Sequence, residues 1–149
     1  HFGARANPIC GYKLMNYNNI TKAYQNAERQ ALEEMNDPHQ IILTIFDALL
    51  KSMQIFVDNM DLKNGGDAEL KSKHFARALT IIYALQSSLD FERGEEIASN
   101  LFQLYEYARQ KLISDLGKGV VADTPSAIDA LKEIRDAWHM IGDEVKDAK

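Results

Sequence analysis

Cysteine, proline and glycine are scarce in this 149-residue chain, and long apolar runs are missing. The single cysteine, Cys10, cannot form an internal disulfide, which fits a reducing compartment. The three prolines and eight glycines lie almost entirely outside the periodic apolar segments, so long uninterrupted helices are expected. No apolar run approaches the roughly 18 residues of a membrane span, and the N-terminus lacks the layout of a secretory signal. We therefore expect a cytoplasmic protein without membrane insertion.

An excess of positive charge is also absent. The 17 Lys and Arg are outnumbered by 22 Asp and Glu, which gives a net charge of −5 and a pI near 5.3. The basic residues are scattered rather than gathered in a stripe, so the chain lacks the electrostatic footprint of phosphate-backbone binding. We therefore exclude nucleic acid as a partner. The length and the 46% hydrophobic content fit one compact domain.

Signatures of catalysis are missing as well. The chain has no glycine-rich phosphate loop, no His-Glu-x-x-His motif and none of the Glu-x-x-His pairs that build di-metal sites in helical bundles. Outside the first fourteen residues, the histidines are His39 near a helix start, His74 on a core side and His139 beside Trp138. Without acidic companions, their interpretation is structural rather than metal-binding. We expect no enzymatic activity, no cofactor and no metal.

The chain divides into three parts. Residues 1–14 show no periodicity and precede Met15, so we interpret them as an expression-derived leader. Residues 15–37 form an N-terminal amphipathic arm with a narrow apolar stripe that begins with Tyr17, Ile20 and Tyr24. The arm should end before Pro38, because the residue that precedes a proline is pushed out of the helical region. Residues 38–149 form the main domain.

Four helices are expected in the main domain. They should cover residues 38 to about 62, 67–88, 95–116 and 124 onward, with a connection over residues 89–94. Asp37 and Thr124 each precede a proline in the order of a helix N-cap. The inward stripes are Ile42, Ile45, Phe46, Leu49, Met53, Phe56, Val57 and Met60; Leu70, His74, Ala78, Ile81, Ile82 and Leu85; Ile97, Leu101, Leu104, Tyr105, Ala108 and Leu112; Leu131, Ile134, Trp138, Ile141 and Val145. Short connections make an all-α, antiparallel up-down four-helix bundle the simplest packing.

Several apolar residues lie beside these stripes. Leu43 and Leu50 fall on one flank of the first helix, and Phe102 and Ile113 lie about 90° from the core face of the third, at 100° per residue. Such positions can be ordinary boundary residues. Together they predict shallow grooves that accept an amphipathic helix, and the arm itself has suitable spacing to act as a lid.

The order of several short stretches resembles the FliS family of flagellin-specific export chaperones. They are Lys22-Ala23-Tyr24, Pro38-His39-Gln40-Ile41-Ile42 with Phe46-Asp47, Leu89-Asp90 with Glu92, Gly94 and Glu96-Ile97-Ala98, Asn100-Leu101 with Leu104-Tyr105-Glu106-Tyr107, and Arg135-Asp136-Ala137-Trp138. The resemblance covers about residues 16–145. Ala48 departs from it, since family members often carry glycine there, and the first fourteen residues have no counterpart.

The resemblance implies a bundle that binds the C-terminal region of flagellin in the cytosol, prevents premature polymerisation and aids delivery to the flagellar type III export gate. It also implies that the arm covers part of the groove and takes part in docking to the gate, which makes Tyr17, Ile20 and Tyr24 candidate contacts. The groove residues Leu43, Leu50, Phe102 and Ile113 come from the face analysis alone. The alternative is a helical-bundle adaptor that binds an amphipathic peptide unrelated to flagella.

Overall fold

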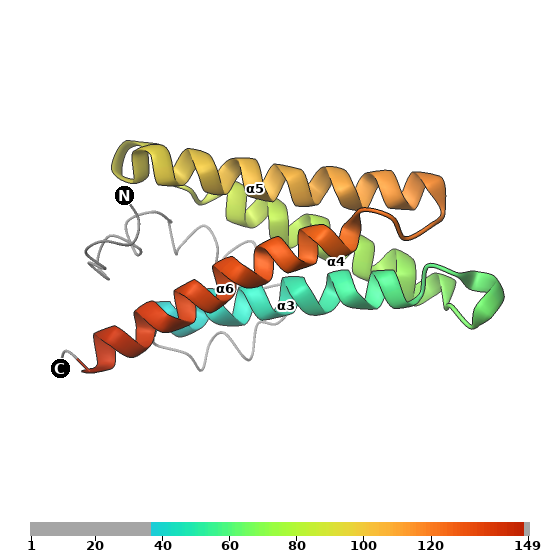
Figure 1. The fold of residues 1–149 in the computed structure, drawn as a ribbon, viewed down its shortest axis with the longest axis horizontal. Helices are drawn as coiled ribbons and strands as arrows, with labels where there is room; N and C mark the ends of the chain where they lie inside the picture. Colours follow the sequence, from blue (N-terminus) through green and yellow to red (C-terminus); the bar gives the residue numbers. More distant parts are fainter. Residues whose placement is uncertain (1–36, 148–149) are drawn as a thin grey trace.

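The computed structural model describes residues 37–147 as four long helices, with the side chains described up to Ile141. They are α3 (Pro38–Asp58), α4 (Ala68–Ser87), α5 (Phe91–Lys118) and α6 (Thr124–Asp147), and a 3₁₀ turn η1 (Leu62–Asn64) follows α3. Successive helices run in opposite directions along one axis (Figure 1). α3 packs between α4 and α6, and α5 completes the ring by contacting both of these helices. The predicted all-α up-down bundle is confirmed.

An aspartate begins three of the helices. Asp37 accepts a hydrogen bond from the N–H of His39 at 3.0 Å, and Pro38 occupies the first helical position, as the sequence predicts. Asp67 accepts from the N–H groups of Glu69 and Leu70 at 2.9 and 3.0 Å. These carboxylates satisfy amide groups that have no partner inside the helix, so each helix start is determined locally.

α3 ends at Asp58, four residues earlier than predicted. The Asn59 side chain donates to the carbonyl of Ile55 at 2.8 Å, and its backbone N–H also turns back onto the last carbonyls of α3. The chain then folds tightly, since Gly65 has a φ of 96° and a Cβ at Gly66 would lie 2.6 Å from the carbonyl oxygen of Asn59. The connection is therefore longer than the predicted one.

α5 begins four residues earlier than predicted and contains a break. Asp90 caps a first turn, Phe91–Gly94, by accepting from the N–H groups of Glu92 and Arg93, both at 3.1 Å. Glu95 then adopts φ 48° and ψ −122°, and the helix continues after it. The predicted connection over residues 89–94 is thus wrong at residues 91–94. The predicted start at Glu95 matches the start of the uninterrupted part.

The core is formed by the inward stripes of all four helices. Its largest fully buried side chains are Tyr105, Phe46, Phe56, Ile42, Ile45, Leu49, Met53, Ile81, Ile82 and Leu85. The Phe46 and Tyr105 rings lie 6.4 Å apart, and burial raises the pKa of the Tyr105 phenol. One predicted inward residue, Leu70, is exposed because it lies in the first turn of α4, at the end of the bundle.

α6 is tied to α3 at both polar and aromatic contacts. The Trp138 indole N–H donates to the carbonyl of His39 at 3.1 Å, and the two rings stack with 5.0 Å between their centroids. The guanidinium of Arg135 donates to both carboxylate oxygens of Asp47, at 2.8 and 3.4 Å. These contacts join residues that are 99 and 88 positions apart, so they fix how α6 lies on α3.

α3 is the one helix in this part of the chain that is long and apolar enough to cross a membrane, with a mean hydropathy of 1.5 over 18 residues. Its apolar residues Ile42, Ile45, Leu49 and Met53 are completely buried within the bundle. A central core helix passes the same test of length and composition. The hydropathy of α3 is therefore accounted for by its place between α4 and α6.

Candidate functional site

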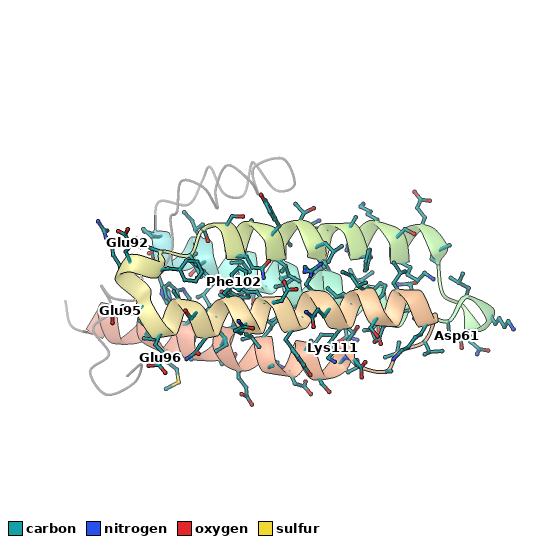
Figure 2. The ribbon with its side chains drawn as sticks, turned by 90° about the horizontal axis from the view of Figure 1, so that it is seen from above. Asp61, Glu92, Glu95, Glu96, Phe102 and Lys111 are labelled. Atoms are coloured by element: carbon teal, nitrogen blue, oxygen red, sulfur yellow. The ribbon has the colours of Figure 1, made fainter. Side chains whose placement is uncertain are left out.

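Two side-chain stripes run beside each other along the outer edge where α4 and α5 pack together. On α4 the stripe is Leu79, Tyr83 and Gln86, and on α5 it is Phe102, Glu106, Arg109 and Ile113. Spacings of three and four residues place the members of each stripe on one helix face. We call these seven residues, together with Phe91, the α4–α5 surface. Figure 2 shows Phe102 between the two helices.

The centre of the α4–α5 surface is polar and rigidly bonded. The Gln86 amide donates to the Glu106 carboxylate at 3.2 Å and to the carbonyl of Phe102 at 3.5 Å. Arg109 Nε donates to Glu106 Oε1 at 2.9 Å, and a second guanidinium nitrogen pairs with Glu106 Oε2. The hydrogen bonds from Arg109 and Gln86 lower the pKa of Glu106 to about 2. Glu106 therefore stays ionised and holds the two helices in register.

Apolar side chains lie on both sides of this polar centre. Tyr83 is 70% exposed and Ile113 is 42% exposed. Phe102 is half-buried, and its ring lies 6.0 Å from that of Phe91, which is 48% exposed. An interface of this kind, with aromatic and aliphatic anchors around a fixed polar pair, suits an amphipathic partner helix.

The structure places the four predicted groove residues at different sites. Phe102 and Ile113 belong to the α4–α5 surface. Leu50 is half-buried on α3 and lies on the same helix face as Asp47, the residue that accepts a hydrogen bond from Arg135 of α6. Leu43 is only 4% exposed and belongs to the core, so the prediction that it lines an accessible groove is wrong. The α3–α6 edge lies across the ring from the α4–α5 edge, so Leu50 does not join the other two residues.

Sequence reasoning missed Tyr83 and Phe91. Tyr83 lies on the outer side of α4, away from the inward stripe, and its spacing from Gln86 is the signal that could have found it. Phe91 lies in the predicted connection over residues 89–94, and helical periodicity does not predict which way a side chain points outside a helix. The predicted arm contacts Tyr17, Ile20 and Tyr24, like the leader 1–14, lie outside the described residues.

A depression lies at the end of the bundle, between the α3–α4 connection and the α5–α6 connection. It has a volume of about 610 Å³ and is lined by Val57, Met60, Leu62, Val120 and Val121, with charged residues at its rim. Leu62, Val120 and Val121 are all exposed. Asp61, which Figure 2 labels at this end, already caps η1 through the N–H of Lys63 at 3.1 Å. The depression is therefore open, with a lining that is partly apolar and partly charged.

The histidines take structural positions. His39 is buried against Trp138, and His139 is exposed. His74 Nδ1 lies 3.2 Å from the Ser52 hydroxyl, and burial, together with the nearby cation of Arg77, lowers its pKa. Within residues 37–141, no group of three or more His, Cys, Asp and Glu side chains is arranged to hold a metal ion.

Comparison with known proteins identifies the family of this chain. A family profile described as "Flagellar protein FliS" matches residues 20–145. The flagellar secretion chaperone FliS of Salmonella typhimurium is 29% identical over 124 residues, which cover 80% of this chain and 87% of the relative. The flagellar secretion chaperone FliS of Vibrio cholerae is 25% identical, and the match covers 83% of this chain and 88% of the relative. The flagellar secretion chaperone FliSB of Pseudomonas aeruginosa is 29% identical, and the match covers 78% of this chain and 90% of the relative. The chain therefore belongs to the FliS family of flagellar secretion chaperones.

Proposed function

We propose that this protein is a cytoplasmic chaperone of flagellar type III export, without enzymatic activity, that binds the C-terminal region of flagellin. By covering that region it prevents premature polymerisation and aids delivery to the export gate. Membership of the FliS family supports the assignment to flagellar secretion. The observation that carries the binding role is the α4–α5 surface, where exposed apolar anchors surround a fixed ion pair.

The energetics of the α4–α5 surface fit such a client. A flagellin segment that folds on binding loses about 2–5 kcal/mol of the gross interaction to its ordering. Each large apolar side chain that becomes fully buried contributes roughly 1.5–3 kcal/mol, and less if it is already half-buried. Tyr83, Phe102 and Ile113 can therefore offset the ordering cost together, whereas one of them cannot. The client requires several anchors spaced along a helix, as in groove recognition of amphipathic helices.

Other surfaces take a secondary place in the proposal. Leu50, on the α3–α6 edge, becomes accessible to a client only if the client wraps around the bundle. We assign two roles to the arm residues Tyr17, Ile20 and Tyr24. They cover the α4–α5 surface in the absence of client, and they dock at the export gate. If the arm competes with the client, deletion of residues 15–34 should strengthen flagellin binding. If it contacts the gate, Ile20→Ala with Tyr24→Ala should impair secretion and leave flagellin affinity unchanged.

Calorimetry with a C-terminal flagellin peptide tests the binding role. We expect one peptide per chaperone, and a loss of about tenfold to a hundredfold in affinity when Tyr83→Ala is combined with Ile113→Ala, because two anchors are removed. Met140→Ala on α6 is the matched control, since Met140 is 63% exposed and lies outside the α4–α5 surface.

Three results would contradict the proposal. Absence of detectable heat at tens of micromolar peptide, which corresponds to about 6–7 kcal/mol, would rule out a useful client affinity. Recovery of a different stoichiometric partner from a flagellated cell, with no flagellin, would favour the adaptor that binds an unrelated amphipathic peptide. An equal effect of the double variant and Met140→Ala would place the binding surface elsewhere on the bundle.

A further inference from the structure

The break in α5 lies at a residue with an unfavourable backbone conformation. Glu95 has φ 48° and ψ −122°, and it is the only residue other than glycine with a positive φ between residues 37 and 147. Side chains with a Cβ rarely adopt this region, and glycine adopts it readily. Glu95 is exposed, as Figure 2 shows near the start of α5, and its side chain forms no hydrogen bond or ion pair with residues 37–141. The strain must be balanced by a contact made elsewhere.

The contact that the break makes possible is the pair of rings on the α4–α5 surface. In a continuous helix, Phe91 and Phe102 would be separated by eleven residues, or about 16 Å along the axis. In the structure their ring centroids are 6.0 Å apart, because the turn Phe91–Gly94 folds back at Glu95. The break therefore places one aromatic ring over another that would otherwise be more exposed.

The folded-back turn is a self-contained unit. Asp90 accepts from Glu92 and Arg93 through its side chain, and its carbonyl accepts from the N–H of Gly94 at 2.8 Å. These bonds stay within the turn and its cap, so the turn can change its orientation without losing them. Phe91 remains about half exposed even when it lies against Phe102. The Phe91 end of the turn is thus only partly covered, while its other end, Gly94, is buried beside the strained residue Glu95.

We propose that the turn Phe91–Gly94 is a lid over Phe102, and that it opens when Glu95 enters the helical region and α5 straightens. Opening relieves the backbone at Glu95 and uncovers Phe102, and a bound client then covers Phe102 in place of Phe91. The client thereby selects the open form, and its apparent affinity is reduced by the fraction of protein that is closed. This regulation rests on the proposed function of the α4–α5 surface.

The lid can be tested without any client. Glu95→Gly relieves the strain of the closed form and disfavours the straight helix, so it should shift the protein towards the closed form. Glu96→Gly removes the same charge and adds a glycine one position later, inside the regular helix, so it is the matched control. The readout is the fluorine NMR spectrum of the 4-fluorophenylalanine-labelled chain, with the signals assigned by Phe91→Leu and Phe102→Leu. We expect Glu95→Gly alone to move the Phe91 and Phe102 signals together towards a single closed position.

Binding of the flagellin C-terminal peptide gives the second readout. Phe91→Ala removes the cover, and an open population of about 10% in the wild type predicts an affinity about tenfold higher. Glu95→Gly should weaken binding by about fivefold or more, because relief of backbone strain stabilises the closed form. Both variants should retain cooperative thermal unfolding.

The lid is refuted if Phe91→Ala weakens peptide binding, because Phe91 would then be a contact of the client. It is also refuted if Glu95→Gly and Glu96→Gly give the same fluorine spectra. A wild-type protein that does not bind the peptide contradicts the proposed function instead, and the fluorine spectra then decide on the lid by themselves.

Discussion

Asp115 should be the most important single carboxylate for the stability of the bundle. It is completely buried on α5, and its two oxygens accept hydrogen bonds from three consecutive backbone N–H groups, those of Ala122, Asp123 and Thr124, at 2.8 to 3.1 Å. These groups form the end of the α5–α6 connection and the start of α6. The connection is therefore built around one side chain, and Asp115→Ala removes the acceptor for all three groups.

The size of the effect follows from the three donors. The N–H of Thr124 is buried with its residue and cannot reach water, so loss of its charged acceptor costs about 1.5–3 kcal/mol. Ala122 and Asp123 are more exposed, and hydration of their N–H groups limits the cost to about 0.5–1.5 kcal/mol each. Removal of the cost of burying a carboxylate offsets part of the loss. We expect Asp115→Ala to lower the free energy of unfolding by about 3 kcal/mol.

The effect should depend on pH in one direction. Burial raises the pKa of Asp115 most strongly among the separate causes, but the hydrogen bonds from Thr124, Ala122 and Asp123 together bring it below its ordinary value of 3.8. A lowered pKa in the folded state means that the stabilisation is complete above the unfolded pKa of 3.8 and is lost as the pH falls through the folded value. The difference in stability between the wild type and the alanine variant should therefore be constant around pH 7 and become smaller as the pH falls below about 4.

Urea unfolding measures this prediction. With an m-value of about 1.5 kcal/mol per M, a loss of about 3 kcal/mol moves the midpoint by about 2 M. Asp123→Ala is the control from the same connection, because among residues 37–141 the Asp123 side chain makes only an exposed ion pair with Lys118 at 3.9 Å, which is worth less than about 1 kcal/mol. Equal losses for the two variants, or a difference that persists unchanged to pH 3, would refute the reasoning.

Three further substitutions test the core. Trp138→Phe keeps most of the stacked ring but removes the hydrogen bond to the His39 carbonyl, so thermal unfolding should show a loss of about 1–3 kcal/mol, and no loss would mean that this bond is not formed. Leu43→Ala should lower the free energy of unfolding by about 2–5 kcal/mol in urea, whereas a surface residue would give less than about 0.5 kcal/mol. Tyr105→Phe should leave stability unchanged or raise it by about 1 kcal/mol in the same assay, because the buried Tyr105 hydroxyl has no hydrogen-bond partner among residues 37–141; a clear loss would point to a missed acceptor.

The helices and most of their inward faces were predictable because they depend on local information. A 3.6-residue apolar period identifies a helix and its buried side, and Asp37 followed by Pro38 marks a helix start by itself. The same local rules explain the errors. Asp90 is a helix cap like Asp37, but Gly94 four residues later is typical of a connection. The sequence therefore predicts a connection where the first turn of α5 lies.

The candidate site was only partly predictable, because accessibility depends on the neighbouring helix. Leu43 and Leu50 lie on one face of α3, seven residues apart, and have the same angle from the core stripe. Yet the first is buried and the second is half-exposed, since coverage by the packed neighbours changes along the length of α3. The apolar periodicity of α3 cannot predict this difference in burial between Leu43 and Leu50. The division of the predicted residues between two edges of the bundle has the same origin.

The sequence by itself determined that this chain forms helices, roughly where they lie, which side of each is buried, and to which family it is similar. Only the tertiary structure decided which apolar flanks stay open, that Arg135 reaches Asp47 across 88 positions, and that Glu95 bends α5 so that Phe91 covers Phe102. The physical reason is that helix periodicity and capping are set by residues within a few positions of one another. Coverage, long-range pairing and backbone strain are instead set by what another helix places against them.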